Sequence, residues 1–326
     1  MTKALVTCLH LQRHFSKFRS QYEELGVETI LPDIPGQQLD GVGMLRHIEG
    51  VDAVIAGDDV ISADVLRVGK ASGLKAVIKW GIGTDSIDKV AAKDLGIPVY
   101  NTPGVFSDEV ADLALSLLLD LVRQTHRMHA SVLSGEWLKI EGRSLAGMTA
   151  GVIGLGSIGL GIARRTNAFG MRTIGYDVRD ADRGALARCG AEQVALDALL
   201  SQSNAVLIAC NLTPENRQLI GKAAFEQMQN GSFIVNVSRG PLIDESALVA
   251  ALASGKIAGA GLDVFETEPL PADAPLRAYA DRCVFTTHNG SNTREAVARI
   301  NQMTTDILFD VLGLKPAHGF KPNRVA

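Results

Sequence analysis

Short apolar runs alternate with amphipathic stretches along the first third of the chain. Runs rich in Val, Ile, Leu and Ala are typical of buried parallel strands, and the stretches between them have apolar residues at helical spacing. This alternation predicts a parallel sheet with helices on both faces. The predicted strands cover residues 4–8, 28–31, 52–56, 74–79 and 97–100, and the predicted helices lie near 11–24, 41–49, 62–69 and 86–95.

The same alternation resumes near residue 149 and continues to about 289. A long helix is predicted over 107–126, after a turn cluster at residues 101–104 that favours a hinge. A helix over 293–312 follows the last strand, and we expect it to cross back to the first part of the chain. The predicted strands of this second part are 150–154, 172–177, 205–210, 233–237, 259–264 and 284–287.

A glycine motif follows the first strand of the second part. Gly154, Gly156 and Gly159 have Gly-x-Gly-x-x-Gly spacing, a helix is predicted from Ser157, and Asp177 ends the next strand. In this context the first glycine permits a tight turn, the second lets the backbone approach a pyrophosphate, and the third lets helix and strand pack closely. The motif predicts a dinucleotide site, with the phosphates at the helix N-terminus.

These patterns predict an α/β protein with two doubly wound parallel-sheet domains. We expect a Rossmann cofactor domain over residues 101–290, nested within a flavodoxin-like substrate domain formed by residues 1–100 and 291–326. The chain length of 326 residues agrees with two domains.

Composition excludes several classes of partner and site. The net charge is -4 with no basic block, which argues against nucleic acid or an anionic membrane as the main partner. The four cysteines are scattered, and His126 and His129 have no acidic or cysteine partner nearby in sequence, so we expect neither disulfides nor a metal site. The N-terminus predicts a strand rather than a signal peptide. We expect a cytoplasmic protein.

Three chemically active side chains follow strands of the second domain. Arg239 follows 233–237, Glu268 follows 259–264, and His288 follows 284–287. Ligands of open α/β sheets bind beyond the carboxyl ends of the strands. Arg suits a carboxylate or a polarised carbonyl, His donates a proton near neutral pH, and a carboxylate beside that His favours its imidazolium form and orients it. The set predicts proton transfer coupled to redox chemistry at a carbonyl.

Several longer stretches carry a resemblance to a known family. They are residues 79–88 (KWGIGTDSID), 101–104 (NTPG), 145–149, 154–159, 212–215, 236–240 and 261–269 (GLDVFETEP), followed by His288. Together they resemble the D-isomer-specific 2-hydroxyacid dehydrogenases, in the D-3-phosphoglycerate dehydrogenase-like branch and in its short form without a regulatory C-terminal domain. The resemblance implies an NAD-dependent oxidoreductase acting on a D-2-hydroxy acid or 2-keto acid, and a homodimer.

The resemblance also implies roles for individual residues. Arg239, Glu268 and His288 would be catalytic, and Asp263 would contact the nicotinamide amide. The backbone N–H groups around Gly81 and Ile82 would hold the substrate carboxylate. The implied cofactor-binding residues are Gly154, Gly156, Ser157, Ile158, Gly159, Asp177, Thr213, Val237, Ser238 and Asp263, and the implied substrate-binding residues are Lys79, Gly81, Ile82 and Arg239.

Some positions depart from the family pattern. The loop after 52–56 reads Gly57-Asp58-Asp59, where phosphoglycerate enzymes often have an Arg, and two acids there would repel a phosphate. Lys79 either supplies a positive charge instead or is a solvated lysine at a strand end. Asn211 and Asn216 replace a more usual Pro and Thr near the cofactor loop.

Other functional hypotheses stay open at this point. Arg179, near Asp177, leaves NADP as a minority alternative to NAD. The substrate is phosphoglycerate-like or another small acid such as glyoxylate, hydroxypyruvate, formate or phosphite. An NAD(H)-sensing corepressor-like protein on the same fold is the alternative outside enzymes. The resemblance places the region of Trp137 at a dimer interface, and we expect this side chain to be buried there.

Overall fold

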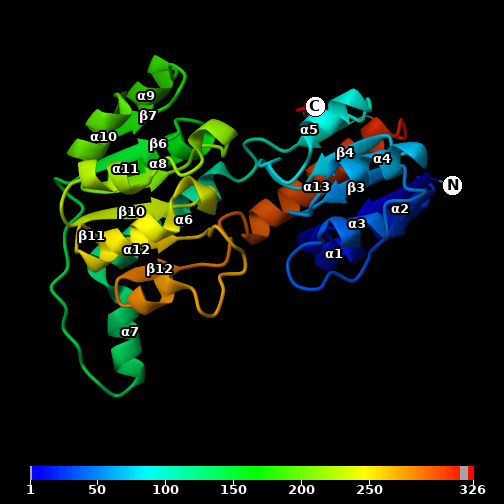
Figure 1. The fold of residues 1–326 in the computed structure, drawn as a ribbon. Coiled ribbons are helices and arrows are strands. Elements are labelled where there is room, and N and C mark those ends of the chain that lie inside the picture. Colours follow the sequence, from blue (N-terminus) through cyan, green and yellow to red (C-terminus); the bar gives the residue numbers. More distant parts are fainter. Residues whose placement is uncertain (1, 316–321) are drawn as a thin grey trace. The chain divides into compact units, whose positions relative to one another are not determined.

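A computed structural model describes residues 2–315 and 322–326 of the chain. It divides into two compact units (Figure 1). Unit 1 comprises Met1–Val105 and Thr293–Ala326, and unit 2 comprises Phe106–Asn292. Each unit contains one sheet of mainly parallel strands covered by helices, so the predicted α/β fold class with two such domains is confirmed. The assignment of the units as substrate and cofactor domains stays a prediction.

The sheet of unit 1 has the strand order β13-β5-β4-β3-β1-β2. All its neighbouring strands are parallel except the short pair of β13 with β5. Strands β3 and β4 are buried along their whole length, because helices cover both faces. The strands are β1 (Thr2–Val6), β2 (Val27–Ile30), β3 (Ala53–Ala56), β4 (Ala76–Lys79), β5 (Val99–Asn101) and β13 (Asn323–Arg324).

The last long helix belongs to unit 1 although it follows unit 2 in sequence. Helix α13 (Arg294–Val311) packs against β3, β4 and α1 (Leu9–His14), as Figure 1 shows. Its Phe309 contacts Tyr22, whose ring also lies edge-on to Phe15. The other helices of this unit are α2 (Arg19–Glu24), α3 (Gly41–Leu45), α4 (Ala63–Ala71) and α5 (Lys89–Asp94).

The continuous helix predicted over 11–24 is wrong. Helix α1 ends at His14, a 3₁₀ turn covers Phe15–Lys17, and α2 begins at Arg19. Phe15, at the start of this break, and Tyr22, beyond it, are both buried in the core, where they are 4% and 1% exposed.

The sheet of unit 2 has seven parallel strands in the order β12-β11-β10-β9-β6-β7-β8. The order reverses between β6 and β9, which is where doubly wound sheets bind ligands. Six strands were predicted, and the seventh, β8, is short and lies at the edge without full burial. The strands are β6 (Thr149–Ile153), β7 (Arg172–Tyr176), β8 (Ala191–Gln193), β9 (Ala205–Ile208), β10 (Ser232–Asn236), β11 (Ile257–Leu262) and β12 (Cys283–Phe285).

Helices cover both faces of this sheet. Helix α8 packs on β6 and β7, α12 packs on β11, and α6 packs on β10 and β11. In the part of the chain that the structure describes, no helix has the length and apolar character needed to cross a membrane. The helices of the sheet are α6 (Ser107–Arg123), α8 (Ser157–Ala168), α9 (Arg183–Cys189), α10 (Leu196–Gln202), α11 (Lys222–Gln227) and α12 (Glu245–Ala253).

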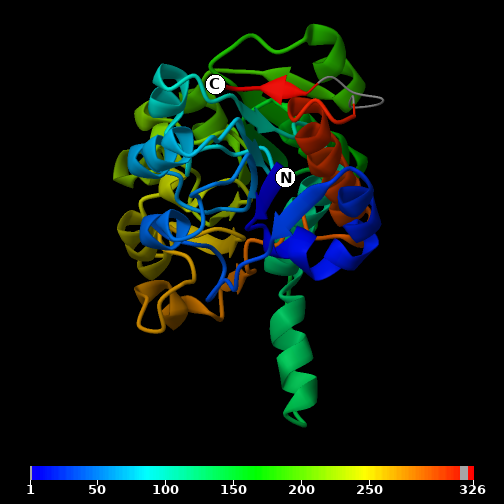
Figure 2. The same cartoon turned by 90° about the vertical axis from the view of Figure 1, so that its right-hand side faces the viewer.

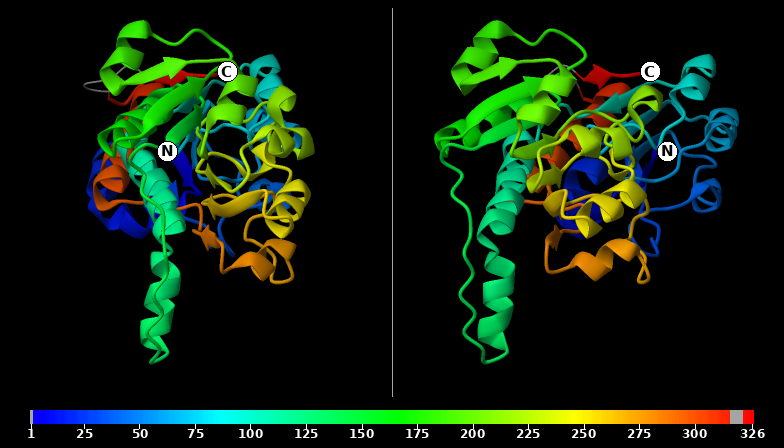
Figure 3. Two further views of the ribbon diagram at one scale, coloured as in Figure 1. Left: turned by 90° about the vertical axis from the view of Figure 1, so that its left-hand side faces the viewer. Right: turned by 60° about the vertical axis from the view of Figure 1, so that its left-hand side comes forward.

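The single helix predicted over 107–126 is also wrong. Gln124 adopts a left-handed backbone conformation (φ 52°) that ends α6, and a separate helix α7 (Thr125–Leu133) follows. The Arg143 N–H donates to the Val122 carbonyl near this end of α6, so a segment distant in sequence satisfies a terminal carbonyl group. Helix α7 extends away from the sheet of its own unit (Figures 2 and 3).

Helix α7 and the segment after it expose several large apolar side chains. Val132, Leu133 and Trp137 are 55%, 75% and 78% exposed in the single chain. Trp137 is therefore not covered by its own chain. Its burial against a second copy stays a prediction.

Candidate active site

In the glycine turn after β6, two of the three glycines have no room for a side chain, and the third has. Gly154 has φ +95°, and a Cβ there would lie 2.5 Å from the Cys210 nitrogen. A Cβ on Gly159 would lie 1.8 Å from the Gly154 carbonyl oxygen. A Cβ on Gly156 would meet no heavy atom within 4 Å. Gly154 and Gly159 are therefore required by the protein's own packing, whereas Gly156 keeps backbone accessible from outside.

The N-terminus of α8 follows directly. Its N-cap is Gly156, and no side chain of the described chain caps it. Gly156 and Ser157 are exposed, so the first N–H groups of this twelve-residue helix are open to a ligand. An open helix N-terminus beside a glycine without steric cover suits an anion such as a pyrophosphate.

Asp177 is held at the end of β7, next to the same turn. Its Oδ2 accepts a hydrogen bond from the Leu155 nitrogen (2.9 Å), and its Oδ1 accepts one from the Arg179 nitrogen (3.0 Å). These bonds fix the carboxylate and leave further lone pairs that ribose hydroxyls would use. The backbone of unit 2 therefore fits an NAD-type dinucleotide at this end of the sheet.

Side-chain hydrogen bonds hold two further loops at this end of the sheet, one after β9 and one after β10. The Thr213 nitrogen donates to the Asn216 Oδ1, and the Asn216 amide donates to the Asn211 carbonyl, both at 2.7 Å. Asn216 thus rigidifies the loop in which it departs from the family pattern. Ser238 hydrogen-bonds through its hydroxyl to the Cys210 carbonyl, which ties the loop after β10 to the end of β9.

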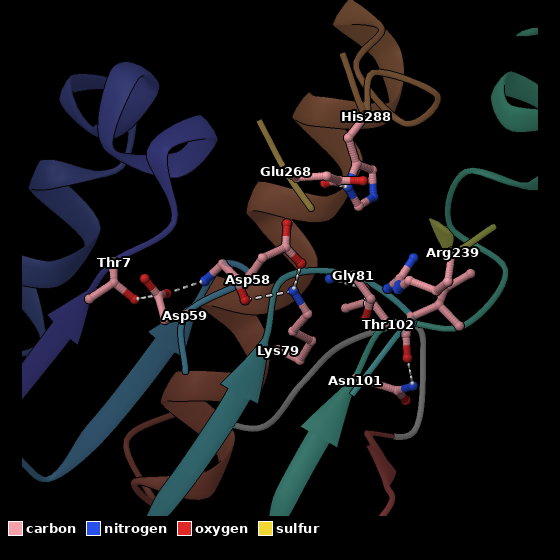
Figure 4. A network of polar contacts seen from close by, with 12 residues as sticks. Thr7, Asp58, Asp59, Lys79, Gly81, Asn101, Thr102, Arg239, Glu268 and His288 are labelled. Carbon is pink, nitrogen blue, oxygen red and sulfur yellow. Dashed lines mark hydrogen bonds and ion pairs between the residues drawn. The ribbon is translucent and has the colours of Figure 1, made fainter. Parts of the chain in front are cut away.

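Glu268 and His288 form the chemically most informative contact of unit 2. The His288 Nδ1 lies 2.8 Å from the Glu268 Oε2, and both side chains are about one-quarter exposed (Figure 4). The Phe265 nitrogen donates to the other carboxylate oxygen at 3.0 Å. Because an ionised carboxylate only accepts, Nδ1 carries the proton in this contact.

Arg239 follows β10 in a tightly packed segment. Its carbonyl accepts from the Asn236 side-chain amide (2.8 Å), and its Nη1 donates to the Ser238 carbonyl (2.8 Å). A Cβ on the next residue, Gly240, would lie 1.8 Å from the Phe265 carbonyl carbon. The segments after β10 and β11, which carry Arg239 and Glu268, are thus in direct backbone contact.

The structure gives Asp263 a role that the sequence analysis missed. This carboxylate is 2% exposed and accepts hydrogen bonds from the Thr286 hydroxyl (2.7 Å) and from the nitrogens of Asn289 (2.8 Å) and Gly290 (3.0 Å). Its carbonyl also accepts from the His288 nitrogen at 2.7 Å. His288 itself has a left-handed backbone (φ 51°), which is uncommon for a residue other than glycine. Asp263 therefore holds the loop that carries His288.

In unit 1, the segment after β4 contains the residues expected to hold a carboxylate. Gly81 has φ +133°, and its nitrogen donates to the Thr102 hydroxyl oxygen at 3.2 Å, so this N–H is already engaged. The Asn101 amide donates to the Ile82 carbonyl at 2.7 Å. No acceptor among the described residues is recorded for the Ile82 nitrogen. The Ile82 N–H is thus the more available donor of the two.

Lys79 is buried at the end of β4. Its side chain is 3% exposed, and its Nζ donates to the Gly57 carbonyl (2.6 Å) and to the Asp58 Oδ1 (2.7 Å), as Figure 4 shows. This burial excludes the alternative that Lys79 is a solvated lysine at a strand end.

The two adjacent acids after β3, Asp58 and Asp59, differ in their burial and in their hydrogen-bond partners. Asp59 is 0% exposed and accepts from the Thr7 hydroxyl (2.5 Å) and the nitrogens of Leu39 (2.8 Å) and Gly57 (2.9 Å). Burial raises the pKa of the Asp59 carboxyl, and these hydrogen bonds oppose the shift. The expectation that both acids face a substrate is wrong for Asp59, because its side chain points into the protein.

We expect Asp59→Ala to lower the free energy of unfolding by about 3 kcal/mol, because it leaves the buried donors of Thr7, Leu39 and Gly57 without an acceptor. Urea denaturation followed by circular dichroism measures this loss. Asp64→Ala is the control, since Asp64 makes only an exposed ion pair, and should cost less than about 1 kcal/mol. Equal losses in the two variants would contradict a structural role for Asp59.

Comparison with known proteins identifies the family to which this geometry belongs. Residues 115–290 match the model of the D-isomer specific 2-hydroxyacid dehydrogenase NAD-binding domain. The chain is 37% identical over 287 residues to the hydroxypyruvate reductase of Thermotoga maritima, covering 86% of this chain and 92% of that protein.

Two further proteins show how the family varies. A D-3-phosphoglycerate dehydrogenase of Methanocaldococcus jannaschii is 38% identical over 294 residues, covering 89% of this chain but 54% of that longer protein. The apo-structure of D-lactate dehydrogenase from Escherichia coli superimposes with a TM-score of 0.82 at 32% identity and covers all of both chains. These similar proteins are named for different substrates.

Proposed function

Because the chain belongs to the D-isomer specific 2-hydroxyacid dehydrogenase family, whose NAD-binding domain it contains, we propose that it reduces a small 2-keto acid at C2, and oxidises the matching D-2-hydroxy acid. The observation that carries this proposal is the 2.8 Å contact between the His288 Nδ1 and Glu268, at the carboxyl end of the unit 2 sheet. The chain is thus an oxidoreductase, and its substrate is the part that the family leaves open.

In this mechanism His288 exchanges a proton with the substrate oxygen. Bound NADH would supply the hydride equivalent for C2. Glu268 accepts a hydrogen bond from the Nδ1–H of His288, so Nε2 is the ring atom proposed to donate its proton to the oxygen as negative charge develops there. Glu268 also stabilises the imidazolium form that makes this donation, and Asp263 keeps the His288 loop in place.

Arg239 is proposed to bind the substrate carboxylate and to polarise the carbonyl. A planar guanidinium suits both tasks because its donors form a rigid fork. The Ser238 carbonyl already restrains Arg239 through Nη1. Lys79, Gly81 and Ile82 are proposed to take part in substrate binding, with the Ile82 N–H as the available backbone donor.

For the cofactor, we propose that the pyrophosphate lies on the N-terminus of α8 and that Asp177 binds a ribose. The open Gly156 and the uncapped helix support this placement. The other proposed cofactor contacts are Gly154, Ser157, Ile158, Gly159, Thr213, Val237, Ser238 and Asp263.

Asp177→Asn should raise the ratio of kcat/KM with NADPH to that with NADH by about tenfold, because the carboxylate repels a 2′-phosphate and accepts from a 2′-hydroxyl. Asn keeps one acceptor oxygen, so it retains one of the two backbone hydrogen bonds that Asp177 accepts from Leu155 and Arg179. Initial rates with both cofactors at a fixed keto acid concentration measure the ratio. A ratio equal to that of the unchanged protein would show that Asp177 does not select the cofactor.

The proposed activity is tested by following NADH absorbance with purified protein and a panel of glyoxylate, pyruvate, hydroxypyruvate and 3-phosphohydroxypyruvate. Turnover of at least one keto acid that is lost in an Arg239→Ala variant supports the proposal. Lack of turnover with every member of the panel, while NADH still binds, would contradict it and favour a role in NAD(H) sensing.

We also propose that the protein is a homodimer and cytoplasmic. The exposed apolar side chains of Val132, Leu133 and Trp137 on and after α7 support burial against a second copy, because such a patch is unfavourable in water. Light scattering coupled to size exclusion measures the mass directly, and a monomer at micromolar concentration would contradict the proposed dimer.

A further inference from the structure

The ion pair of Lys79 and Asp58 lies at the carboxyl edge of the unit 1 sheet. Lys79 ends β4, and Asp58 follows β3, its direct neighbour in the sheet. The Cε of Lys79 lies 3.9 Å from the position that a Cβ would have on Gly81. Figure 4 labels both residues. The ammonium group therefore lies beside the segment proposed to receive the substrate.

The positive charge of Lys79 is balanced within the protein. Its Nζ lies 2.7 Å from the Asp58 Oδ1 and donates to the Gly57 carbonyl at 2.6 Å. An ammonium group has three donors, so one remains beyond these two bonds. The Lys79 side chain is 3% exposed, whereas that of Asp58 is 39% exposed. A ligand approaching from solvent would therefore meet the Asp58 carboxylate before it met an unbalanced cation.

Asp59 does not add to this charge from the solvent side. Its carboxylate is buried on Thr7, Leu39 and Gly57, as described above. Of the two adjacent acids, Asp58 is thus the one that a ligand can meet. The pair places an ammonium donor and a carboxylate acceptor side by side.

We propose that Asp58 is a specificity-determining residue that selects an uncharged, hydroxyl-bearing C3 group on the 2-keto acid and disfavours a phosphate there. This inference rests on the proposed function and names the substrate class for it. A hydroxyl accepts from the remaining Lys79 donor and donates to Asp58, so both members of the pair stay satisfied. A phosphate dianion has only acceptors to offer and is repelled by the carboxylate.

The partial exposure of Asp58 limits the size of the effect. Solvent screens the interaction between Asp58 and a substituent, so a fully buried carboxylate would discriminate more strongly. A unit charge facing a dianion at contact distance in a water-like dielectric still corresponds to a rate ratio of roughly ten or more.

The test compares kcat/KM for hydroxypyruvate with that for 3-phosphohydroxypyruvate, using NADH, in the unchanged protein and in Asp58→Asn. Asn is nearly isosteric and removes the charge. We expect the ratio of phosphorylated to unphosphorylated substrate to rise by about tenfold in Asp58→Asn. Asp58→Glu should keep the original ratio, and Asp64→Asn, at an exposed acid on α4 of the same unit, should leave it unchanged.

An unchanged ratio in a folded Asp58→Asn variant would overturn the inference. Asp58→Ser is the second variant, because it also removes the carboxylate. It should raise the ratio as Asp58→Asn does, and an unchanged ratio in folded Asp58→Ser would overturn the inference even if Asp58→Asn does not fold.

Failure of the inference and failure of the proposed function give different results. Active protein with an unchanged ratio contradicts only the role of Asp58. Protein that binds NADH but turns over neither substrate, nor glyoxylate nor pyruvate, contradicts the proposed function, and the specificity inference with it.

Discussion

His288→Asn should lower kcat for 2-keto acid reduction by about a thousandfold, because loss of a positioned proton donor typically costs two to four orders of magnitude in rate. Asn is chosen because His288 has a left-handed backbone (φ 51°), which Asn tolerates better than most residues. The short amide neither protonates near neutral pH nor reaches as far as an imidazole. Single-turnover and steady-state NADH oxidation measure the loss.

Two controls separate chemistry from folding. NADH affinity, followed by nucleotide fluorescence, should change less than about threefold, since His288 is proposed to contact the substrate oxygen rather than to hold the dinucleotide. His14→Asn, at an exposed histidine that ends α1, should leave kcat unchanged. Near-normal turnover by His288→Asn would remove His288 from the mechanism.

Gly156→Ala should weaken NADH binding at least about tenfold while leaving the free energy of unfolding unchanged. An Ala Cβ at this position meets no heavy atom of the protein within 4 Å, and the backbone has φ -72°, which any residue adopts. The methyl group therefore disturbs only a ligand that lies against the backbone. Titration of NADH fluorescence and urea denaturation give the two values.

Gly159→Ala provides the contrast within the same turn. Its Cβ would lie 1.8 Å from the Gly154 carbonyl oxygen, so the helix and the turn must separate. We expect a loss of about 3 kcal/mol or more in the free energy of unfolding, together with weaker NADH binding. Gly41→Ala, whose Cβ would be 4.0 Å from the nearest atom, controls for the substitution itself. Unaltered NADH affinity in Gly156→Ala would contradict a pyrophosphate at this turn.

Much of the fold was predictable because its determinants are local. Each buried parallel strand is a short apolar run, and the turn after β6 needs glycine at positions set by its own backbone. The predicted strands fall within a few residues of those observed. The misses were the short edge strands β8 and β13, the break at Phe15–Lys17 and the end of α6 at Gln124. In each, contacts distant in sequence or partial burial outweighed the local pattern.

The sequence by itself determined the two-sheet architecture, the family and the candidate chemistry of Arg239, Glu268 and His288. Strand ends and glycine spacing are readable from the chain, because the carboxyl ends of parallel strands share one edge of a sheet. These features need no knowledge of side-chain direction.

Only the tertiary structure decided what neighbouring side chains do. In the structure the Asp59 side chain points into the protein interior, whereas that of Asp58 pairs with Lys79, although the two acids are adjacent in sequence. The structure also shows that the Asp263 carboxylate hydrogen-bonds to the backbone of the loop that carries His288. The physical reason is that a carboxylate takes the direction in which its donors lie, and most of those donors come from segments 20 or more residues away.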